Sequence, residues 1–281
     1  MLELIDADYA YPGGITALSA VNIAIRPGEK VALLGANGAG KTTLLNVLNG
    51  TLRPAGGALQ LDGQPVRYDR GGLRHLRQRV GMVLQDPDDQ LFAASVFEDV
   101  SFGPSNLDLG EAMVAQRVTA ALEAMQVVDL ADRPTHMLSF GQRKRVAIAG
   151  ILAMEPRYLL LDEPSAGLDP DGVGQLMSAL GNVSQAGTAI VMATHDMDAA
   201  YAWADRILIF GEGRIAAAGD PEAVFVDRDL LSRLRLTPPL LWEIGELLRR
   251  SKVGAARPLP ISRQRHGILS EIEALVSRIG D

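Results

Sequence analysis

Short apolar runs separated by helical patterns dominate the first 220 residues. The runs lie at residues 30–34, 80–84, 158–161, 189–193 and 206–210. Apolar strands that alternate with helical segments are typical of a parallel sheet with crossover helices. The pattern therefore predicts an α/β core.

A second pattern precedes and interrupts this core. Residues 2–7 and 21–25 alternate apolar and polar positions around a Pro12-Gly13-Gly14 turn, and residues 57–61 show the same alternation. Period-two alternation predicts half-buried strands, so we expect an N-terminal antiparallel β subdomain. We expect a last small strand at residues 214–219.

Between residues 87 and 154 the chain carries mostly helical signals. They are strongest at residues 111–125 and 142–153. We therefore expect a helical subdomain inserted into an α/β domain that spans residues 1–220.

The pattern changes again after Pro221, where short helices predict a C-terminal helical extension at residues 221–281. Its segments are an apolar helical stripe at residues 240–248 that contains Trp242, a basic linker at 251–265 and an amphipathic helix at 268–279. The stripe is interpreted as a packed helix, with a dimer contact or a regulatory cap as alternatives. The basic residues near the linker are interpreted as solvated, with contact to anionic lipid as the alternative; they are Arg249, Arg250, Lys252 and Arg257.

Composition narrows the classes of protein. The 281 residues are 47% hydrophobic and 22% charged, which is ordinary for a globular protein, and the net charge of −7 argues against nucleic-acid binding by bulk charge. With no cysteine, neither disulfides nor thiolate metal sites are possible. The acidic start does not resemble a signal peptide, and polar residues break the longest uncharged run at 172–194. Any membrane association is thus expected to come through a partner or through a surface of the protein.

The segment Gly35-Ala-Asn-Gly-Ala-Gly-Lys41-Thr42 fits the phosphate-binding pattern GxxxxGK[ST]. An apolar strand precedes it and a helical run at residues 43–49 follows. Such glycines allow backbone N–H groups to turn toward phosphates, and the following helix adds the positive end of its dipole. The segment therefore predicts a nucleotide site in which Lys41 adds charge and Thr42 ligates magnesium.

A second apolar strand ends in Asp162-Glu163. Magnesium-dependent phosphoryl transfer needs one carboxylate to hold the metal and can use another as a base on water. Solvated acids at a strand end are the alternative, but the phosphate loop favours the functional interpretation.

Three further segments complete a known arrangement: Leu138-Ser139-Phe140-Gly141-Gln142, Leu168-Asp169 and Thr194-His195-Asp196. In this order and spacing, residues 2–220 resemble the ATP-binding subunits of ABC transporters. The resemblance implies that Tyr11 stacks on adenine, Gln85 reaches magnesium and the attacking water, and His195 contacts the γ-phosphate. It also implies a head-to-tail dimer of two copies, with two ATP molecules at the interface.

The expected site residues follow from the motifs and the resemblance. ATP is held by Tyr11, Gly35, Asn37, Gly38, Ala39, Gly40, Lys41, Thr42, Thr43 and Gln85; Mg²⁺ by Thr42, Gln85 and Asp162; catalysis falls to Glu163 and His195; and Ser139, Phe140, Gly141, Gln142 and Asp169 reach the ATP of the second copy.

Each of the later motifs also has a structural interpretation. The helix start near Gln142 resembles an ordinary cap, Asp169 before Pro170 resembles a cap or turn residue, and a lone histidine such as His195 is usually structural. Phe140 stands where the family signature usually has glycine. The remaining histidines form no sequence cluster.

A narrower resemblance comes from the signature, its continuation Arg-Lys-Arg-Val-Ala-Ile-Ala-Gly150, and residues 85–92 and 98–104. These segments are similar to the ATPases of energy-coupling-factor importers, especially those for cobalt and nickel. The resemblance implies a peripheral subunit at the cytoplasmic face of the inner membrane, with a transmembrane coupling protein and a metal-binding membrane component as partners. Cobalt is the first expected cargo, nickel the second and vitamins the third. Pairing with a different ATPase stays open, and Asp88, Asp89 and Gln90 are either partner contacts or a solvated turn.

The cargo itself is not expected to bind this chain, because its four histidines lack metal-site spacing. Two other classes remain as alternatives. A non-transport ABC ATPase would need long heptad insertions or a second cassette, and a regulatory GTPase would need an Asn-Lys-x-Asp segment; we find none of these in the sequence.

Overall fold

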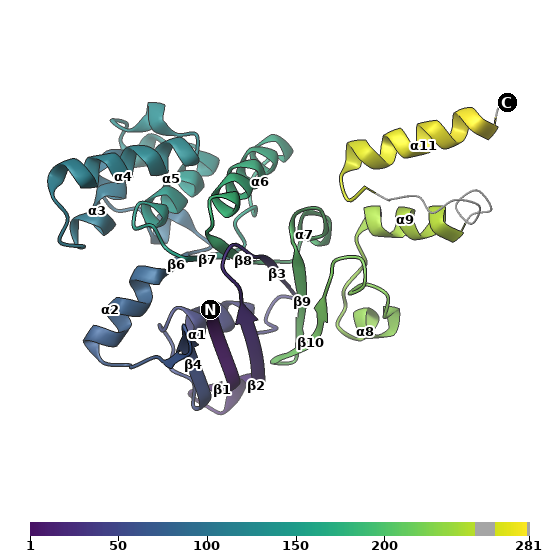
Figure 1. Ribbon diagram of the computed structural model, residues 1–281, viewed down its shortest axis with the longest axis horizontal. Coiled ribbons are helices and arrows are strands. Elements are labelled where there is room, and N and C mark those ends of the chain that lie inside the picture. The colour runs from purple at the N-terminus through teal and green to yellow at the C-terminus, as the bar shows by residue number, and fades with distance from the viewer. Residues whose placement is uncertain (251–261, 280–281) are drawn as a thin grey trace.

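The computed structural model describes residues 1–250 and 262–279 and contains two sheets surrounded by helices (Figure 1). The larger sheet has six strands in the order β10-β9-β3-β8-β7-β6, parallel except for the β9–β10 hairpin. This order confirms the predicted α/β core. The strands are β3 (Lys30–Leu34), β6 (Val80–Val83), β7 (Tyr158–Asp162), β8 (Ala189–Thr194), β9 (Arg206–Gly211) and β10 (Arg214–Gly219).

The smaller sheet is antiparallel, in the order β2-β1-β4-β5. It confirms the predicted antiparallel layer, although its first two strands are longer than expected. They continue to a tight turn in which Gly13 and Gly14 adopt φ angles of 95° and 80°, open to glycine at little cost. The strands are β1 (Leu2–Tyr11), β2 (Ile15–Ile25), β4 (Gly56–Leu61) and β5 (Gln64–Pro65).

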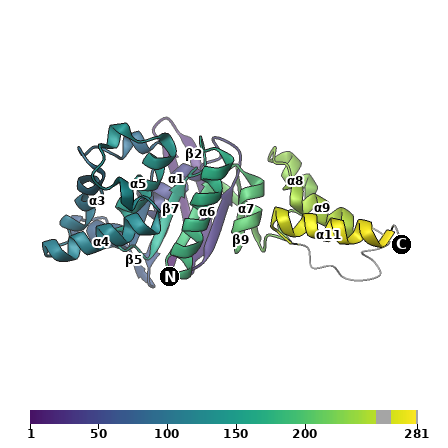
Figure 2. The same ribbon diagram turned by 90° about the horizontal axis from the view of Figure 1, so that it is seen from above.

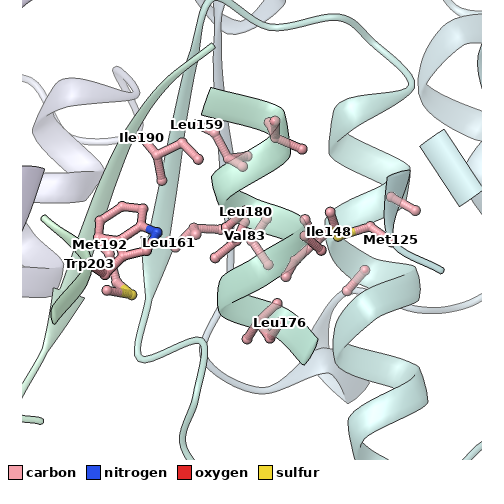
Figure 3. Packing of buried hydrophobic residues seen from close by; sticks show 14 of the residues in the cluster. Val83, Met125, Ile148, Leu159, Leu161, Leu176, Leu180, Ile190, Met192 and Trp203 are labelled. Carbon is pink, nitrogen blue, oxygen red and sulfur yellow. The ribbon is translucent and has the colours of Figure 1, made fainter. Parts of the chain in front are cut away.

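Both faces of the six-stranded sheet are covered. On β7, Leu159 and Leu161 join a cluster with helices on one face, whereas Tyr158 and Leu160 pack toward the antiparallel sheet on the other. Figure 3 shows the first cluster, in which the β-strand side chains meet Leu176 and Leu180 of a helix. Because both faces of these strands are buried, the side chains that point to either face are apolar, and the strands appear in the sequence as continuous apolar runs.

The helices follow the predicted pattern with one addition. α2 was not expected, because its sequence is strongly polar and only Leu76 is buried. In residues 1–250 and 262–279, no helix has both the length and the apolar character needed to cross a membrane. The helices are α1 (Lys41–Leu48), α2 (Arg70–Arg79), α3 (Val96–Ser105), α4 (Glu111–Ala124), α5 (Phe140–Leu152), α6 (Pro170–Gln185), α7 (Met197–Trp203), α8 (Arg228–Arg233), α9 (Leu240–Arg250) and α11 (Arg265–Ile279).

The helices α3, α4 and α5 contact one another and lie together beside the sheet (Figures 1 and 2). They confirm the expected inserted helices, whereas the bounds of the helical subdomain at about residues 87 and 154 stay a prediction. α5 begins two residues earlier than predicted, because Ser139 caps it: the backbone N–H of Gln142 donates to Ser139 Oγ at 3.3 Å. The Gln142 side chain accepts from the Ser139 N–H at 2.9 Å, which completes a capping box.

The C-terminal helices α8, α9 and α11 lie at the β9–β10 end of the large sheet, beside α7 (Figures 1 and 2). Trp242 is 2% exposed, its ring lies 6.2 Å from that of Phe225, and its Nε1–H donates to the Glu222 carbonyl at 3.0 Å. The expected packed helix is therefore confirmed. Most of the predicted linker, with Lys252 and Arg257, lies outside the described residues, and the boundary at residue 220 stays a prediction.

The extension is hydrogen-bonded to α7 at both ends of that helix. The Leu240 N–H donates to Asp198 Oδ1 at 2.8 Å near the start of α7. Near its end, the Arg263 guanidinium donates to the carbonyls of Tyr201 and Ala204, at 3.2 and 2.8 Å. Because the last carbonyls of a helix have no partner within the helix, these bonds satisfy groups that would otherwise need water.

Candidate functional site

A cavity of about 890 Å³ opens at the carboxyl edge of the parallel strands. Tyr11 lines one part of it, and the phosphate loop, Asp162, Glu163 and His195 line another. Ligands of open α/β sheets bind at this edge, and the volume is within the usual range for a nucleotide-sized ligand. The structure thus brings the predicted ATP, magnesium and catalytic residues to one place.

The phosphate loop is shaped by close backbone packing. A Cβ at Gly35 would lie 2.4 Å from the Phe210 carbonyl oxygen, and one at Gly40, where φ is 107°, would lie 2.7 Å from that of Ala17. Only glycine fits these positions without a shift. The buried Lys41 ammonium donates to the carbonyls of Gly35 and Ala36, at 2.7 and 3.2 Å. Burial lowers the pKa of Lys41, although the carboxylates of Glu163 and Asp162 act in the opposite direction.

Thr42 and Asp162 form the pair expected to hold magnesium. Thr42 Oγ1 donates to Asp162 Oδ2 at 2.7 Å, and Gln85 lines the same cavity. Hydroxyl, carboxylate and amide oxygens are the hard ligands that Mg²⁺ prefers, so the residues fit this ion. Burial raises the pKa of the Asp162 carboxyl, an effect that the Thr42 hydrogen bond opposes and the charge of Glu163 reinforces.

Glu163 is held in an unusual backbone conformation with φ of 46°. Its N–H donates to the Ala193 carbonyl at 2.9 Å, and its own carbonyl accepts from the Lys144 ammonium at 2.8 Å. His195 Nδ1 lies 2.9 Å from Glu163 Oε2. The other carboxylate oxygen, Oε1, is buried without a hydrogen bond in the described part of the chain and lies 3.9 Å from Lys41 Nζ. A buried acceptor in this state is available to a water molecule or to another donor in the cavity.

The aromatic wall of the cavity comes from β1. The Tyr11 hydroxyl lies 2.9 Å from Thr43 Oγ1, and its ring meets that of Tyr9 edge to face at 5.1 Å. Tyr11 is 40% exposed and lines the cavity. This geometry suits stacking on a flat base.

The five residues expected to act on the second copy line a separate cavity of about 370 Å³. None of the residues that line it also lines the larger cavity. Asp169 Oδ1 accepts from the Gly172 N–H at 2.7 Å and caps α6, while Ser139 caps α5 as an acceptor. The hydroxyl proton of Ser139 is not used in that bond and stays available to an anion. The helix caps that the sequence analysis gave as structural alternatives for these residues are therefore present. They fix the positions of Ser139 and Asp169, while the Ser139 hydroxyl can still donate a hydrogen bond.

Phe140 packs within its own chain. A Cβ at Gly167, where φ is 78°, would lie 2.8 Å from Phe140 Cε1, so the ring covers this glycine. The Lys144 ammonium lies 5.4 Å from the ring centroid, within the range of a cation–π contact. Phe140 thus fills the space between the signature helix and the loop before Asp169.

Sequence reasoning missed two groups of residues near the site. The first is Lys144. The signature motif beside it is visible in the sequence, but the hydrogen bond from the Lys144 ammonium to the Glu163 carbonyl depends on the packing of α5 against β7. Arg233, Leu234 and Arg235 also line the large cavity. No sequence motif includes these three residues. The fold brings them close to the phosphate loop, which lies almost two hundred residues earlier in the sequence.

Asp162→Asn is expected to stabilise the ligand-free protein at neutral pH. The raised pKa means that the folded state holds this proton more tightly than the unfolded chain, so ionisation above pH ~4 costs stability, whereas at lower pH the carboxyl is protonated in both states. The amide keeps an acceptor for Thr42. We expect Tm to rise by about 3 °C at pH 7 and the gain to shrink as the pH falls to about 4, measured by thermal melting across this range.

The same variant should lose most of the extra melting stability that MgATP confers over ATP with EDTA. A Tm at pH 7 equal to or below that of the wild type would contradict the assigned cost of the buried charge.

Comparisons with known proteins agree with this geometry. Residues 18–166 match the family model described as ABC transporter. The chain is 47% identical over 260 residues to the energy-coupling factor transporter ATP-binding protein EcfA2 of Methanospirillum hungatei, covering 92% of this chain and 65% of that protein. It is 52% identical over 256 residues to the cobalt import ATP-binding protein CbiO of Rhodobacter capsulatus, covering 91% of each.

A solved structure extends the likeness to three dimensions. The cbiO1 protein of Clostridium perfringens, described as part of the ABC transporter complex cbiONQ, matches with a TM-score of 0.76 and 44% identity, over 88% of this chain and 98% of that one. The match of the family model to more than half of the chain and the high identity to relatives agree with the site. The chain belongs to the ABC transporter family of ATP-binding proteins.

Proposed function

We propose that this chain is the ATPase subunit of an energy-coupling-factor importer, which hydrolyses ATP to drive uptake of a transition-metal ion, with cobalt as the first choice. The observation that carries the proposal is the buried, unbonded Oε1 of Glu163 beside Lys41 and the Thr42–Asp162 pair. These groups are what hydrolysis of a bound nucleoside triphosphate requires. The energy-coupling-factor and cobalt-import relatives supply the transport context.

Binding falls to the loop and to Tyr11. Lys41 leaves the loop carbonyls and, with the loop N–H groups, holds the β- and γ-phosphates, while the Tyr11 ring stacks on adenine. Thr42, Asp162 and Gln85 would hold magnesium, which when bound neutralises charge that develops on the phosphates. The desolvated ammonium of Lys41 interacts with phosphate more strongly than it would in bulk water.

The catalytic roles at the γ-phosphate fall to Glu163 and His195. The Glu163 carboxylate orients an attacking water and accepts its proton through the free oxygen. His195, 62% exposed and anchored through Nδ1, has its second ring nitrogen available for the γ-phosphate. The backbone bonds from Ala193 and Lys144 fix Glu163 for this role.

Complete hydrolysis is proposed to need two copies of the ATPase. Ser139, Gly141 and Gln142 line a cavity that shares no residue with the nucleotide cavity, whereas Phe140 also lines a further cavity with Thr42 and Asp162. We therefore propose that the Ser139 donor acts on the γ-phosphate bound by another subunit. A head-to-tail pair places both sets of residues around each ATP. We propose a homodimer, with a different ATPase as the alternative partner.

The membrane partner is proposed to dock at a groove between α2 and α3. Phe92 and Phe102 are 66% and 57% exposed, their rings meet edge to face at 4.9 Å, and they line an apolar cavity of about 370 Å³. We assign this groove to a helix of the transmembrane coupling protein, because an exposed aromatic pair beside a cavity is typical of an interaction site. The chain would then lie peripherally at the cytoplasmic face of the membrane.

The acidic turn next to the groove is mostly engaged within the chain. Asp88 pairs with the Arg143 guanidinium at 2.8 Å, and the Gln90 amide donates to the Ala147 carbonyl at 2.7 Å. Asp89 is exposed. Of the three residues expected to meet a partner, Asp89 is therefore the best placed, and its contact stays a proposal.

The cargo is proposed from the relatives and not from this site. The CbiO relative is named for cobalt import, which ranks cobalt ahead of nickel and of vitamins. A non-transport ABC ATPase is the remaining alternative from another class.

Glu163→Gln is expected to retain ATP binding and to lower steady-state hydrolysis by about 100-fold or more, because the amide keeps the shape and the His195 contact but cannot accept a proton. Phosphate release and ATP binding by the purified full-length protein measure the two effects. Glu212→Gln is the matched control, since Glu212 lines the same cavity but lies on the exposed β9–β10 turn. Turnover near that of the control would rule out Glu163 as the base.

The transport assignment is tested by uptake of radiolabelled cobalt and nickel in cells that lack this protein. We expect the wild type to restore cobalt uptake and Glu163→Gln to restore none, because transport needs hydrolysis. If neither metal responds to the wild type, the metal assignment fails and vitamins become the next cargo to test.

Phe102→Ser is expected to weaken assembly with the membrane partner while ATP binding in solution is unchanged. The measurement is the fraction of the chain that copurifies with detergent-solubilised coupling protein after coexpression. Phe97→Ser is the control, because Phe97 is an exposed phenylalanine of the same helix, 38% exposed, outside the groove. Equal recovery of both variants would place the docking surface elsewhere.

A further inference from the structure

The C-terminal extension reaches the nucleotide cavity through the end of α8. Arg233, Leu234 and Arg235 line the cavity together with the phosphate loop. Leu234 anchors this segment on the β9–β10 turn, where a Cβ at Gly211 would lie 2.4 Å from Leu234 Cδ2. The close fit fixes the two arginines beside a strand that also packs against the loop.

The backbone at this point is ordered by its own hydrogen bonds. The Arg235 N–H donates to the Ser232 carbonyl at 3.0 Å, and the Leu236 N–H to the Leu231 carbonyl at 2.9 Å. Arg235 has a φ of 57°, the left-handed conformation that ends many helices and usually favours glycine. An arginine in this conformation is less favourable than glycine, and it places a long cationic side chain at the rim of the cavity.

The charges that line the cavity show what these arginines change. Among the described residues that line it, the carboxylates are Asp162, Glu163 and Glu212, and Lys41 is the cation that the core contributes. Without Arg233 and Arg235, a polyanionic nucleotide would meet a lining with more negative than positive groups. With them, cations and carboxylates are equal in number before magnesium adds its charge. Two of the three cations therefore come from the extension.

Both guanidinium groups are free to bind an anion. Arg233 and Arg235 are exposed and make neither an ion pair nor a side-chain hydrogen bond within residues 1–250 and 262–279. Other arginines of the extension differ: Arg228 pairs with Glu243 at 3.2 Å, and Arg249 with Glu222 at 2.6 Å. Among the arginines of the extension whose side chains the structure describes, the two without an ion pair or side-chain hydrogen bond are those that line the nucleotide cavity.

We propose that Arg233 and Arg235 bind the phosphate groups of ATP held by the same chain, so that the C-terminal extension forms part of the nucleotide site. Guanidinium groups bind phosphate oxygens through paired, charge-assisted hydrogen bonds. The proposal rests on the proposed nucleotide binding and adds the residues that strengthen it.

The test compares ATP binding by the full-length protein and by the double variant Arg233→Gln/Arg235→Gln, using isothermal titration calorimetry in EDTA so that no hydrolysis occurs. The double variant should bind ATP at least about tenfold more weakly, as expected for the loss of charge-assisted hydrogen bonds. Arg70→Gln is the matched control, because Arg70 is an exposed arginine that begins α2 and does not line the cavity. Arg233→Lys/Arg235→Lys should recover part of the affinity, since lysine keeps the charge.

A second readout separates phosphate binding from a change in the shape of the cavity. Adenosine at millimolar concentration, followed by ligand-observed NMR, should bind the double variant and the wild type equally. An ATP Kd within twofold of the control, or an equal loss of adenosine binding, would overturn the assignment to phosphate. If the double variant melts early, the single substitutions are measured, and an unchanged Kd in both overturns it as well. Failure of the wild type to bind ATP would instead overturn the nucleotide site itself.

Discussion

The burial of three charged groups at one edge of the large sheet is the constraint on which the site depends. Lys41, Asp162 and Glu163 are each less than 10% exposed. Taking charges out of water costs free energy unless they are paired, and here the pairing is incomplete, since Glu163 Oε1 lacks a hydrogen bond in the described structure. The two-sided sheet packing supplies the stability that lets the chain keep them there. The same desolvation strengthens every interaction these groups make with a phosphate or a metal ion.

Glu163 connects the site to the rest of the fold through its backbone. Its N–H is bonded to β8, the strand that leads to His195, and its carbonyl is bonded to Lys144 of α5, the helix that begins at the signature. Burial lowers the pKa of Lys144, and the carboxylates of Glu163, Asp86 and Asp162 act in the opposite direction. The helix that carries the signature and the strand end that carries the base thus share one buried hydrogen bond. A displacement of α5 would act directly on the residue that is proposed to activate water.

The sequence predicted those parts of the structure that have local signals. The strand, loop and helix around Lys41 lie within 20 residues, and the apolar run that ends at Asp162 marks its own strand, so both were found by pattern. α2 was missed because Leu73 and Leu76 are the two apolar side chains among its ten residues, and the early start of α5 was missed because a capping box decides it. The roles of Lys144, Arg233 and Arg235 were missed for a different reason: their contacts are consequences of tertiary packing. A motif lies beside Lys144 but does not reveal its contact with Glu163, and no motif lies near the two arginines.

The extension also shows why a boundary in the sequence pattern is not a boundary in the core. Phe225, Leu231 and Trp242 belong to the same hydrophobic cluster as the helices and strands that precede residue 220. Its polar contacts reach both ends of α7, the helix that follows His195, and its loop after α8 lines the nucleotide cavity. Because buried apolar contacts and hydrogen bonds fix its position together, the extension cannot separate from the core without exposing Trp242 and freeing the end of α7. The extension is therefore packed as part of the ATP-binding domain and forms one side of the nucleotide cavity.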